Sequence, residues 1–215
     1  MVTIPKKLTA DYIATRWPRL YHMAEAGSWP SIQKFGLRST TALLDLFEIQ
    51  GSEREAIEAA RRPQSVQIHH AVHGTAWIRD NKPINETVLR RTLVGLSEPE
   101  WYRSLNSRVF FWLTEDRLTR LRNAPPYRAR PHDILVLSTE RLLDAHADGV
   151  ELSPLNSGAV HPAANYPRGA GTFRSIEDYP WINRIALSPA EPIVELTVRY
   201  IVPDPASLAI DIQTM

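Results

Sequence analysis

The sequence predicts a mixed α+β fold, and three features of the chain support this class. Segments with helical periodicity and segments with strand alternation follow one another irregularly, without the repeated βαβ pattern of a parallel sheet. The glycine-rich strings of nucleotide-binding α/β folds, GxGxxG and GxxxxGK[ST], are absent, as is the GxSxG string of hydrolases. The strongest strand pattern, Pro192 to Val202, comes late in the chain.

Length and composition are typical of a globular protein. The chain has 215 residues, 43% of them hydrophobic and 23% charged, and we expect residues 1–215 to form a single domain. It contains no cysteine, which excludes disulfides and thiolate metal sites and favours a reducing compartment. We find no secretory signal and no run of about 18 apolar residues. A cytoplasmic protein without a membrane segment is therefore expected.

The first 62 residues are expected to be mostly helical, with one brief strand over 20–23. Caps and apolar spacing predict four helices: after Thr9, after Ser28 with Gly36 beyond its end, over 41–50, and from a capping box of Ser52 and Glu55 to before Pro63.

From residue 63 onward, strands and helices are mixed. Alternating or apolar runs predict strands at 66–68, 75–79, 109–113, 134–137 and 192–202. Capping residues predict helices over 85–93, after Ser97 with Glu100, over 114–122 and over 139–146. The proline-rich residues 153–191 are expected to form a long functional or flexible loop. These elements fit two small packed β-sheets with helices around them.

Glu195 is the residue whose direction can be argued most clearly. Alternate residues of a strand share a face, and the set Val194, Leu196, Val198, Tyr200 and Val202 forms an apolar face that we assign to the core. Glu195 then points away from the core, toward a cleft or toward water. In the second case it is a solvent-facing carboxylate beside Arg199.

Histidines offer two further candidates. His22 stands on the brief strand, where a neutral imidazole can bond a ribose hydroxyl while its other nitrogen is held by the backbone; the alternative is a hydrogen-bonded packing residue. His69, His70 and His73 surround a turn at Gly74 and have no carboxylate at a supporting spacing, so no metal site is expected there.

A basic segment runs from Arg117 to His132, with five arginines and no carboxylate. The planar guanidinium group suits phosphate, so this segment is a candidate for contact with a nucleic acid or a diphosphate. The alternative is an ordinary solvated face. The net charge of +1 gives no overall attraction to nucleic acid.

The string LYHMAEAGSWPSIQKFGL, residues 20–37, resembles the opening motif of the RNA 2'-phosphotransferases and of the DNA-targeting ADP-ribosyltransferase toxins of the DarT kind. Those proteins have a Tyr-His or similar pair followed by a short helix that ends in Gly-Leu. The resemblance extends to residue 203, and the whole chain is also similar to an uncharacterised bacterial family.

Three later segments occur in the order of that superfamily. Residues 109–112, VFFW, resemble its aromatic strand, and residues 152–159, LSPLNSGA, resemble a Ser…Gly-Asn-Ala stretch with the Asn and Gly exchanged. Residues 194–203 are similar to a terminal strand in which a catalytic Glu precedes a Val-Pro step. An Arg that follows the aromatic strand in a Pro-Arg context is matched only approximately, by Arg117 after Thr114-Glu115-Asp116.

The resemblance implies an ADP-ribosyltransferase-like fold around an NAD⁺ cleft and an enzyme that uses NAD⁺ as co-substrate, with Glu195 as the catalytic residue. The implied NAD⁺ contacts are His22 at the ribose, Tyr21 or Phe111 against the nicotinamide, Arg38 or Arg117 at the diphosphate, and Asn156. Breaking the nicotinamide–ribose bond passes through an oxocarbenium-like state, which a nearby carboxylate stabilises. No metal is required.

Two alternatives remain beside a toxin or defence enzyme that modifies a nucleic acid or a protein. One is a non-catalytic binding module of the same fold, and the other is transfer of an RNA 2'-phosphate to NAD⁺, for which Glu195 would be dispensable. The transferase interpretation predicts that residues 21–23 and 192–202 are strands of one sheet system, with His22 and Glu195 at the same cleft.

Overall fold

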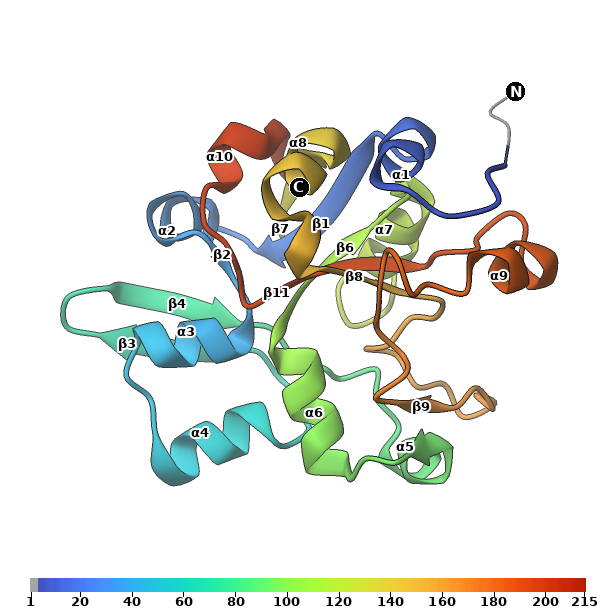
Figure 1. Cartoon of the computed structure of the whole chain (residues 1–215). Coiled ribbons are helices and arrows are strands. Elements are labelled where there is room, and N and C mark those ends of the chain that lie inside the picture. Colours follow the sequence, from blue (N-terminus) through green and yellow to red (C-terminus); the bar gives the residue numbers. More distant parts are fainter. Residues whose placement is uncertain (1–3) are drawn as a thin grey trace.

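A seven-stranded antiparallel sheet forms the centre of the molecule (Figure 1). The structure is a computed structural model that describes residues 4–215. The strand order is β10-β8-β11-β6-β1-β7-β13. The bounds are β10 Arg174–Ser175, β8 Val150–Ser153, β11 Glu195–Arg199, β6 Arg108–Trp112, β1 Arg19–Glu25, β7 His132–Ser138 and β13 Ala209–Thr214.

One face of this sheet carries the main hydrophobic core. Alternate residues of its central strands, among them Leu20, Phe111 and Leu196, are fully or almost fully buried there. Helices α1 (Ala10–Arg16), α8 (Thr139–His146), α9 (Trp181–Leu187) and α10 (Pro205–Leu208) contribute to the same core. On β1 and β7, the opposite face packs through Met23 and Ile134 against Leu118 of α7 (Glu115–Arg122).

A second region lies beyond the end of β6 and β11 (Figure 1). It contains α3 (Thr40–Leu46), α4 (Gly51–Glu58), α5 (Glu86–Thr92), α6 (Glu98–Asn106) and the hairpin of β3 (Val66–His70) and β4 (Gly74–Ile78). The hairpin packs on α3 and α4 through its own apolar cluster, which includes Leu44, Ile57 and Ile78. Helix α2 (Trp29–Phe35) and the two-residue strand β2 (Leu37–Arg38) connect this region to β1.

Two further small ladders complete the strands. Strand β2 pairs with β12 (Ile201–Val202), and β5 (Leu93–Val94) pairs in parallel with β9 (Arg168–Gly169). A 3₁₀ turn, Ala147–Gly149, leads into β8. None of the helices formed by residues 4–215 has the length and apolar character needed to cross a membrane.

The α+β class and most predicted elements are confirmed. The Thr9 hydroxyl accepts a hydrogen bond from the Tyr12 amide, and Ser97 with Glu100 forms the predicted capping box. The capping box at Ser52 is wrong, because α4 begins at Gly51 and Ser52 therefore lies inside its first turn.

Three larger expectations need correction. The strands do not form two small packed sheets, because β8 and β13, which have weak sequence signals, extend one sheet to seven strands. The strand expected over 192–202 breaks at Tyr200, whose φ of 65° turns the chain toward β2, and Tyr200 is exposed and not part of the core face. Residues 153–191 are not a plain loop, since Phe173, Tyr179 and Trp181 are buried and the segment includes α9.

Candidate functional site

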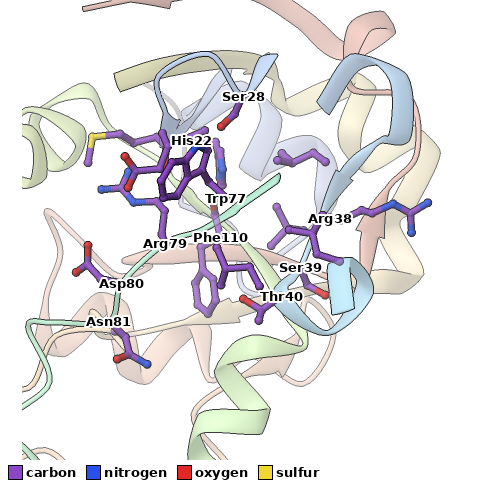
Figure 2. A pocket seen from close by; sticks show the side chains of 18 of the residues that line it. His22, Ser28, Arg38, Ser39, Thr40, Trp77, Arg79, Asp80, Asn81 and Phe110 are labelled. Atoms are coloured by element: carbon purple, nitrogen blue, oxygen red, sulfur yellow. Dashed lines mark hydrogen bonds between the residues drawn. The ribbon is translucent and has the colours of Figure 1, made fainter. Parts of the chain in front are cut away.

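A pocket of about 510 Å³ opens where β1 and β6 separate. Its walls come from β1, α2, the start of α3, the β3–β4 hairpin, β6 and the segment after β8 (Figure 2). The lining includes both His22 and Glu195, as well as Tyr21, Arg38 and Asn156. The sequence thus correctly predicted that the first strand and the terminal strand border one cleft.

The pocket exists because the ladder between β1 and β6 stops after a single pair. Tyr21 lies opposite Trp112, and a continued ladder would place Met23 opposite Phe110. The carbonyls of these last two residues are instead satisfied by side chains: the Phe110 carbonyl accepts from His22 Nδ1 at 2.9 Å, and the Met23 carbonyl accepts from Arg79 Nη1 at 2.8 Å. Side chains therefore satisfy both carbonyls at the point where the two strands separate.

His22 is neutral, and among residues 4–215 only one of its two ring nitrogens has a hydrogen-bond partner. A carbonyl can only accept a hydrogen bond, so Nδ1 carries the proton and Nε2 is left as an acceptor. Burial lowers the pKa of His22 to about 4; the bond to the Phe110 carbonyl opposes this shift, and the positive charge of Arg79 adds to it. A hydroxyl of a ligand in the pocket is a suitable donor to Nε2.

Glu195 is a buried carboxyl group in the row of residues that crosses the sheet. Tyr21, Trp112 and Glu195 are consecutive Cα partners on β1, β6 and β11. Neighbouring strands lie about 4.8 Å apart, so the Cα atoms of Tyr21 and Glu195 are about 10 Å apart. Both carboxyl oxygens of Glu195 accept from the backbone N–H of Ser157, each at 3.2 Å.

The environment of Glu195 disfavours its charged form. Burial raises its pKa to about 7, although the Ser157 hydrogen bonds and the charges of Arg117 and Arg168 act in the opposite direction. Glu195 is 3% exposed, and the cation nearest to it in sequence, Arg199, pairs with Glu151 at 2.6 Å. The interpretation of Glu195 as a solvent-facing carboxylate beside Arg199 is therefore wrong.

The prediction that Phe111 lines the pocket is off by one residue, because its neighbour Phe110 lines it. Phe111 does not line the pocket; it is buried in the main core, with its ring 5.8 Å from that of His22. Phe110 and Trp112 point to the other face of β6 and line the pocket. Strand alternation forces this choice, because the core face of β6 is the one that Val109 and Phe111 share.

The two arginines predicted for the diphosphate differ in position. Arg38 lines the pocket through part of its side chain, but its Nε donates to the Phe35 carbonyl at 2.7 Å and Figure 2 shows its guanidinium directed away from the other labelled side chains. Arg117 does not line the pocket and forms two hydrogen bonds to the carboxylate of Glu191, at 2.9 and 2.5 Å.

Two arginines that line the pocket, Arg79 and Arg62, were not predicted from the sequence. Arg79 leaves the end of β4, lies 4.9 Å from the ring centre of Tyr127 and reaches the Met23 carbonyl beside His22. Arg62 also lines the pocket but is committed to structure: it donates to the carbonyls of Ile57 and Arg79 and to Asn106, and burial lowers its pKa to about 10. The only sequence signal for Arg79 is a cation placed directly after a strand that borders a turn.

The basic segment 117–132 flanks the pocket without filling it. Leu121 and Tyr127 line the pocket, whereas its arginines do not. Arg120, Arg128 and Arg130 are exposed.

The three clustered histidines lie at the hairpin tip. The rings of His70 and His73 stack at 4.5 Å, and His69 Nδ1 lies 3.2 Å from the Thr75 hydroxyl oxygen. Among residues 4–215, no group of three or more His, Cys, Asp or Glu side chains has an arrangement that could hold a metal ion.

Two ends of the sequence resemblance meet beside the pocket. Leu37 pairs with Val202, and Gly36, with a φ of 84°, fits against the chain there. A Cβ atom at position 36 would lie 3.0 Å from the Val202 oxygen and 3.1 Å from Pro203 Cα, so this approach of the two segments requires glycine at position 36.

Fold and site define an α+β protein whose main pocket is lined by a neutral histidine and a buried carboxyl group. The chain belongs to a family of unknown function, DUF7002, whose model matches residues 18–209. Neither the curated proteins nor the solved structures contain a match to the chain.

Proposed function

We propose that this protein is an NAD⁺-dependent ADP-ribosyltransferase with Glu195 as its catalytic residue. The observation that carries the proposal is the placement of His22 and Glu195 on one pocket. These are the two residues to which the sequence resemblance assigns ribose binding and catalysis.

The two side chains have complementary chemistry for a ribosyl group. Nε2 of His22 accepts a hydrogen bond from a ribose hydroxyl, because Nδ1 is fixed on Phe110. Glu195 lines the same pocket two strands away from β1, in the row Tyr21–Trp112–Glu195, and the proposal requires one nucleoside to contact both His22 and Glu195. Tyr21 and Phe110 are two of the aromatic side chains that line the pocket, and we assign the nicotinamide ring to them.

In the proposed reaction, the bond between the ribose carbon C1' and the nicotinamide nitrogen breaks, and its electron pair leaves with neutral nicotinamide. The positive charge that develops on the sugar is stabilised by the Glu195 carboxylate. An acceptor nucleophile then forms a bond to C1', and its proton passes to Glu195. A carboxyl group with a pKa of about 7 is well matched to that proton transfer.

Arg79 replaces Arg38 and Arg117 as the proposed diphosphate contact. It lines the pocket and lies near enough to His22 to lower the pKa of that residue. Arg79→Lys should raise the KM for NAD⁺ about fivefold, because a point charge lacks the forked donor geometry that suits diphosphate. Arg117→Lys, the matched control, should leave this KM unchanged, and steady-state kinetics would measure both values.

The exposed arginines beside the pocket favour a nucleic acid over a protein as acceptor. Arg120, Arg128 and Arg130 are exposed on the segment whose Leu121 and Tyr127 line the pocket. Such an enzyme would act as a toxin or a defence protein.

Incubation with labelled NAD⁺ and separate pools of DNA, RNA and protein tests the function. We expect label on one pool and release of nicotinamide with the native protein, and neither with Glu195→Gln. Loss of the 2'-phosphate from an RNA, with release of nicotinamide, recovery of that phosphate on the labelled ADP-ribose and full activity of Glu195→Gln, would indicate the phosphotransferase alternative. Binding of NAD⁺ without cleavage would indicate the non-catalytic binding module.

A further inference from the structure

We propose that the pocket-facing side of the β3–β4 hairpin is a binding site for a planar nucleobase, which stacks on Trp77 and hydrogen-bonds to Gln67. The inference rests on the proposed function for the sugar end of the ligand, at His22 and Glu195. It adds the chemical class of the other end and the residues that recognise it.

The hairpin has two different faces. Gln67, Thr75 and Trp77 lie on the face that lines the pocket. On the other face, Ile68, Ala76 and Ile78 are buried against α3 and α4, and Ala76 and Ile78 also reach the pocket lining. The pocket face is therefore held in place by a packed apolar layer behind it.

Trp77 exposes a large, mainly apolar side chain to water, which is unfavourable in the absence of a ligand. It is 42% exposed, and it is the only tryptophan among the exposed large hydrophobic residues of the part of the chain that the structure describes. In Figure 2 its indole is drawn among the labelled side chains that line the pocket, as are His22 and Arg79. An accessible indole face offers a stacking surface to any nucleobase.

Gln67 supplies the complementary polar group. It is the Cα partner of Trp77 in the hairpin, so the two side chains lie next to each other on the same face. Within residues 4–215, the Gln67 amide forms no hydrogen bond with another residue, which leaves both its donor and its acceptor open. A neutral amide beside an aromatic ring matches the mixed donors and acceptors of a base edge better than it matches a charged group.

A planar nucleobase can come from two ligands of the proposed enzyme: the adenine of NAD⁺ and a base of a nucleic-acid acceptor. Both present a flat heteroaromatic ring with hydrogen-bonding edges. The proposed site accepts either ring, and the kinetic arms below identify which one it holds during turnover.

The direct test is calorimetric titration of the full chain with AMP, UMP and ribose 5-phosphate, the last as a ligand without a base. We expect at least one nucleotide to bind more tightly than ribose 5-phosphate. Trp77→Leu should lower the affinity for that nucleotide about 10-fold or more, the scale of one base–aromatic stack, and leave the affinity for ribose 5-phosphate unchanged. Gln67→Ala should reduce the difference in affinity between AMP and UMP.

Tyr166→Leu is the matched control, because Tyr166 is 65% exposed and does not line the pocket. It should bind all three ligands as the native protein does. Two results would overturn the inference: nucleotides that bind no better than ribose 5-phosphate, or a folded Trp77→Leu protein that binds them like the native protein.

Kinetics separate the two sources and the two proposals. A higher KM for NAD⁺ in acceptor-free NAD⁺ cleavage by Trp77→Leu places adenine on Trp77, and a higher KM for an oligonucleotide acceptor alone places the acceptor base there. Nucleotide binding that depends on Trp77, in a native protein that never cleaves NAD⁺, supports this inference while it removes the proposed function.

Discussion

Two buried carboxyl groups on neighbouring strands, Glu151 of β8 and Glu195 of β11, have opposite environments. Glu151 accepts hydrogen bonds from Arg108 at 2.8 Å and from Arg199 at 2.6 Å, and these two cations lower its pKa against the effect of burial. Glu195 has no arginine within hydrogen-bonding distance, and burial raises its pKa. The two residues are 6% and 3% exposed, so exposure does not explain the difference.

The comparison separates a carboxylate that two arginines satisfy from a carboxyl group that accepts hydrogen bonds from one backbone N–H. A buried ion is tolerated when partners satisfy it, as at Glu151. In a buried carboxyl group supported by one backbone N–H, the charged form is destabilised because water no longer solvates it. Groups with pKa values perturbed in this way are frequent in functional pockets. Burial without an ionic partner therefore makes the charged form of Glu195 less stable than that of Glu151.

The largest effect is expected on transferase activity. Glu195→Gln keeps the shape of the side chain and its acceptor oxygen for the Ser157 N–H, but removes the negative charge. We expect transfer to fall by roughly 10²-fold or more, the scale of losing a key electrostatic group. Measurement of kcat with labelled NAD⁺ at pH 8 would determine this.

Glu151→Gln is the control for that experiment, since it makes the same chemical change at the neighbouring buried carboxylate. Its activity should stay within about twofold of the native protein. Equal losses in the two variants would show that both act through the fold, and full activity of Glu195→Gln would exclude Glu195 from the mechanism.

Stability should depend on pH with opposite sign at the two positions. The raised pKa of Glu195 means that its contribution to stability is complete below its ordinary value of 4.5 and is lost as pH rises to about 7. Glu195→Gln has no carboxyl group to ionise and avoids this loss. Above pH 8 the free energy of unfolding of the variant should therefore be higher than that of the native protein by on the order of 3 kcal/mol.

The lowered pKa of Glu151 gives a contribution that is present at neutral pH and is lost in acid. Glu151→Gln should therefore cost about 2 to 3 kcal/mol at pH 7, because Arg108 loses a buried charged partner, and less in acid. Urea unfolding of the native protein and both variants between pH 5 and 9 would show whether the two differences run in opposite directions.

His22 provides the next test, because the proposed reaction requires a sugar held beside Glu195. His22→Asn places an amide donor near the position of Nδ1, so the Phe110 carbonyl keeps a partner, but the acceptor at Nε2 is lost. We expect the KM for NAD⁺ to rise about 10-fold with a smaller change in kcat, the pattern of a lost binding contact. His69→Asn, at the exposed hairpin strand, should have native kinetics; a native KM in His22→Asn would remove His22 from the site.

Local signals in the sequence predicted most of the elements but not their partners. Thr9, Thr114 and the Ser97 capping box define helix ends through bonds to residues three positions away, so the chain itself carries that information. Strand β13 was not predicted, although Ile210-Asp211-Ile212-Gln213 alternates apolar and polar residues as an edge strand does. The Pro-rich segment 153–191 packs through scattered aromatic residues that have no periodicity.

The site shows the same limit. Alternation predicted that Glu195 turns away from the core, and the resemblance singled out His22, but neither predicts that the β1–β6 ladder ends at one pair. The separation of those strands depends on Arg79, which is 56 residues from Met23 in sequence. Arg117 had the right residue type but the wrong partner, since Glu191 holds it from another part of the chain.

The smallest effect is expected at Arg199, the outer partner of Glu151. Its side chain is 66% exposed, whereas that of Arg108 is 12% exposed, so water screens the Arg199 bond and Arg108 supplies most of the support that Glu151 needs. Arg199→Ala should therefore cost less than about 1 kcal/mol of stability and leave transfer unchanged, as thermal unfolding and the NAD⁺ assay would measure. Arg108→Ala should cost more, because it leaves Glu151 buried beside a partner that faces solvent. If Arg199→Ala impaired transfer as strongly as Glu195→Gln does, the two carboxyl groups would belong to one coupled network, and Glu151 would no longer be separable from the chemistry of the pocket.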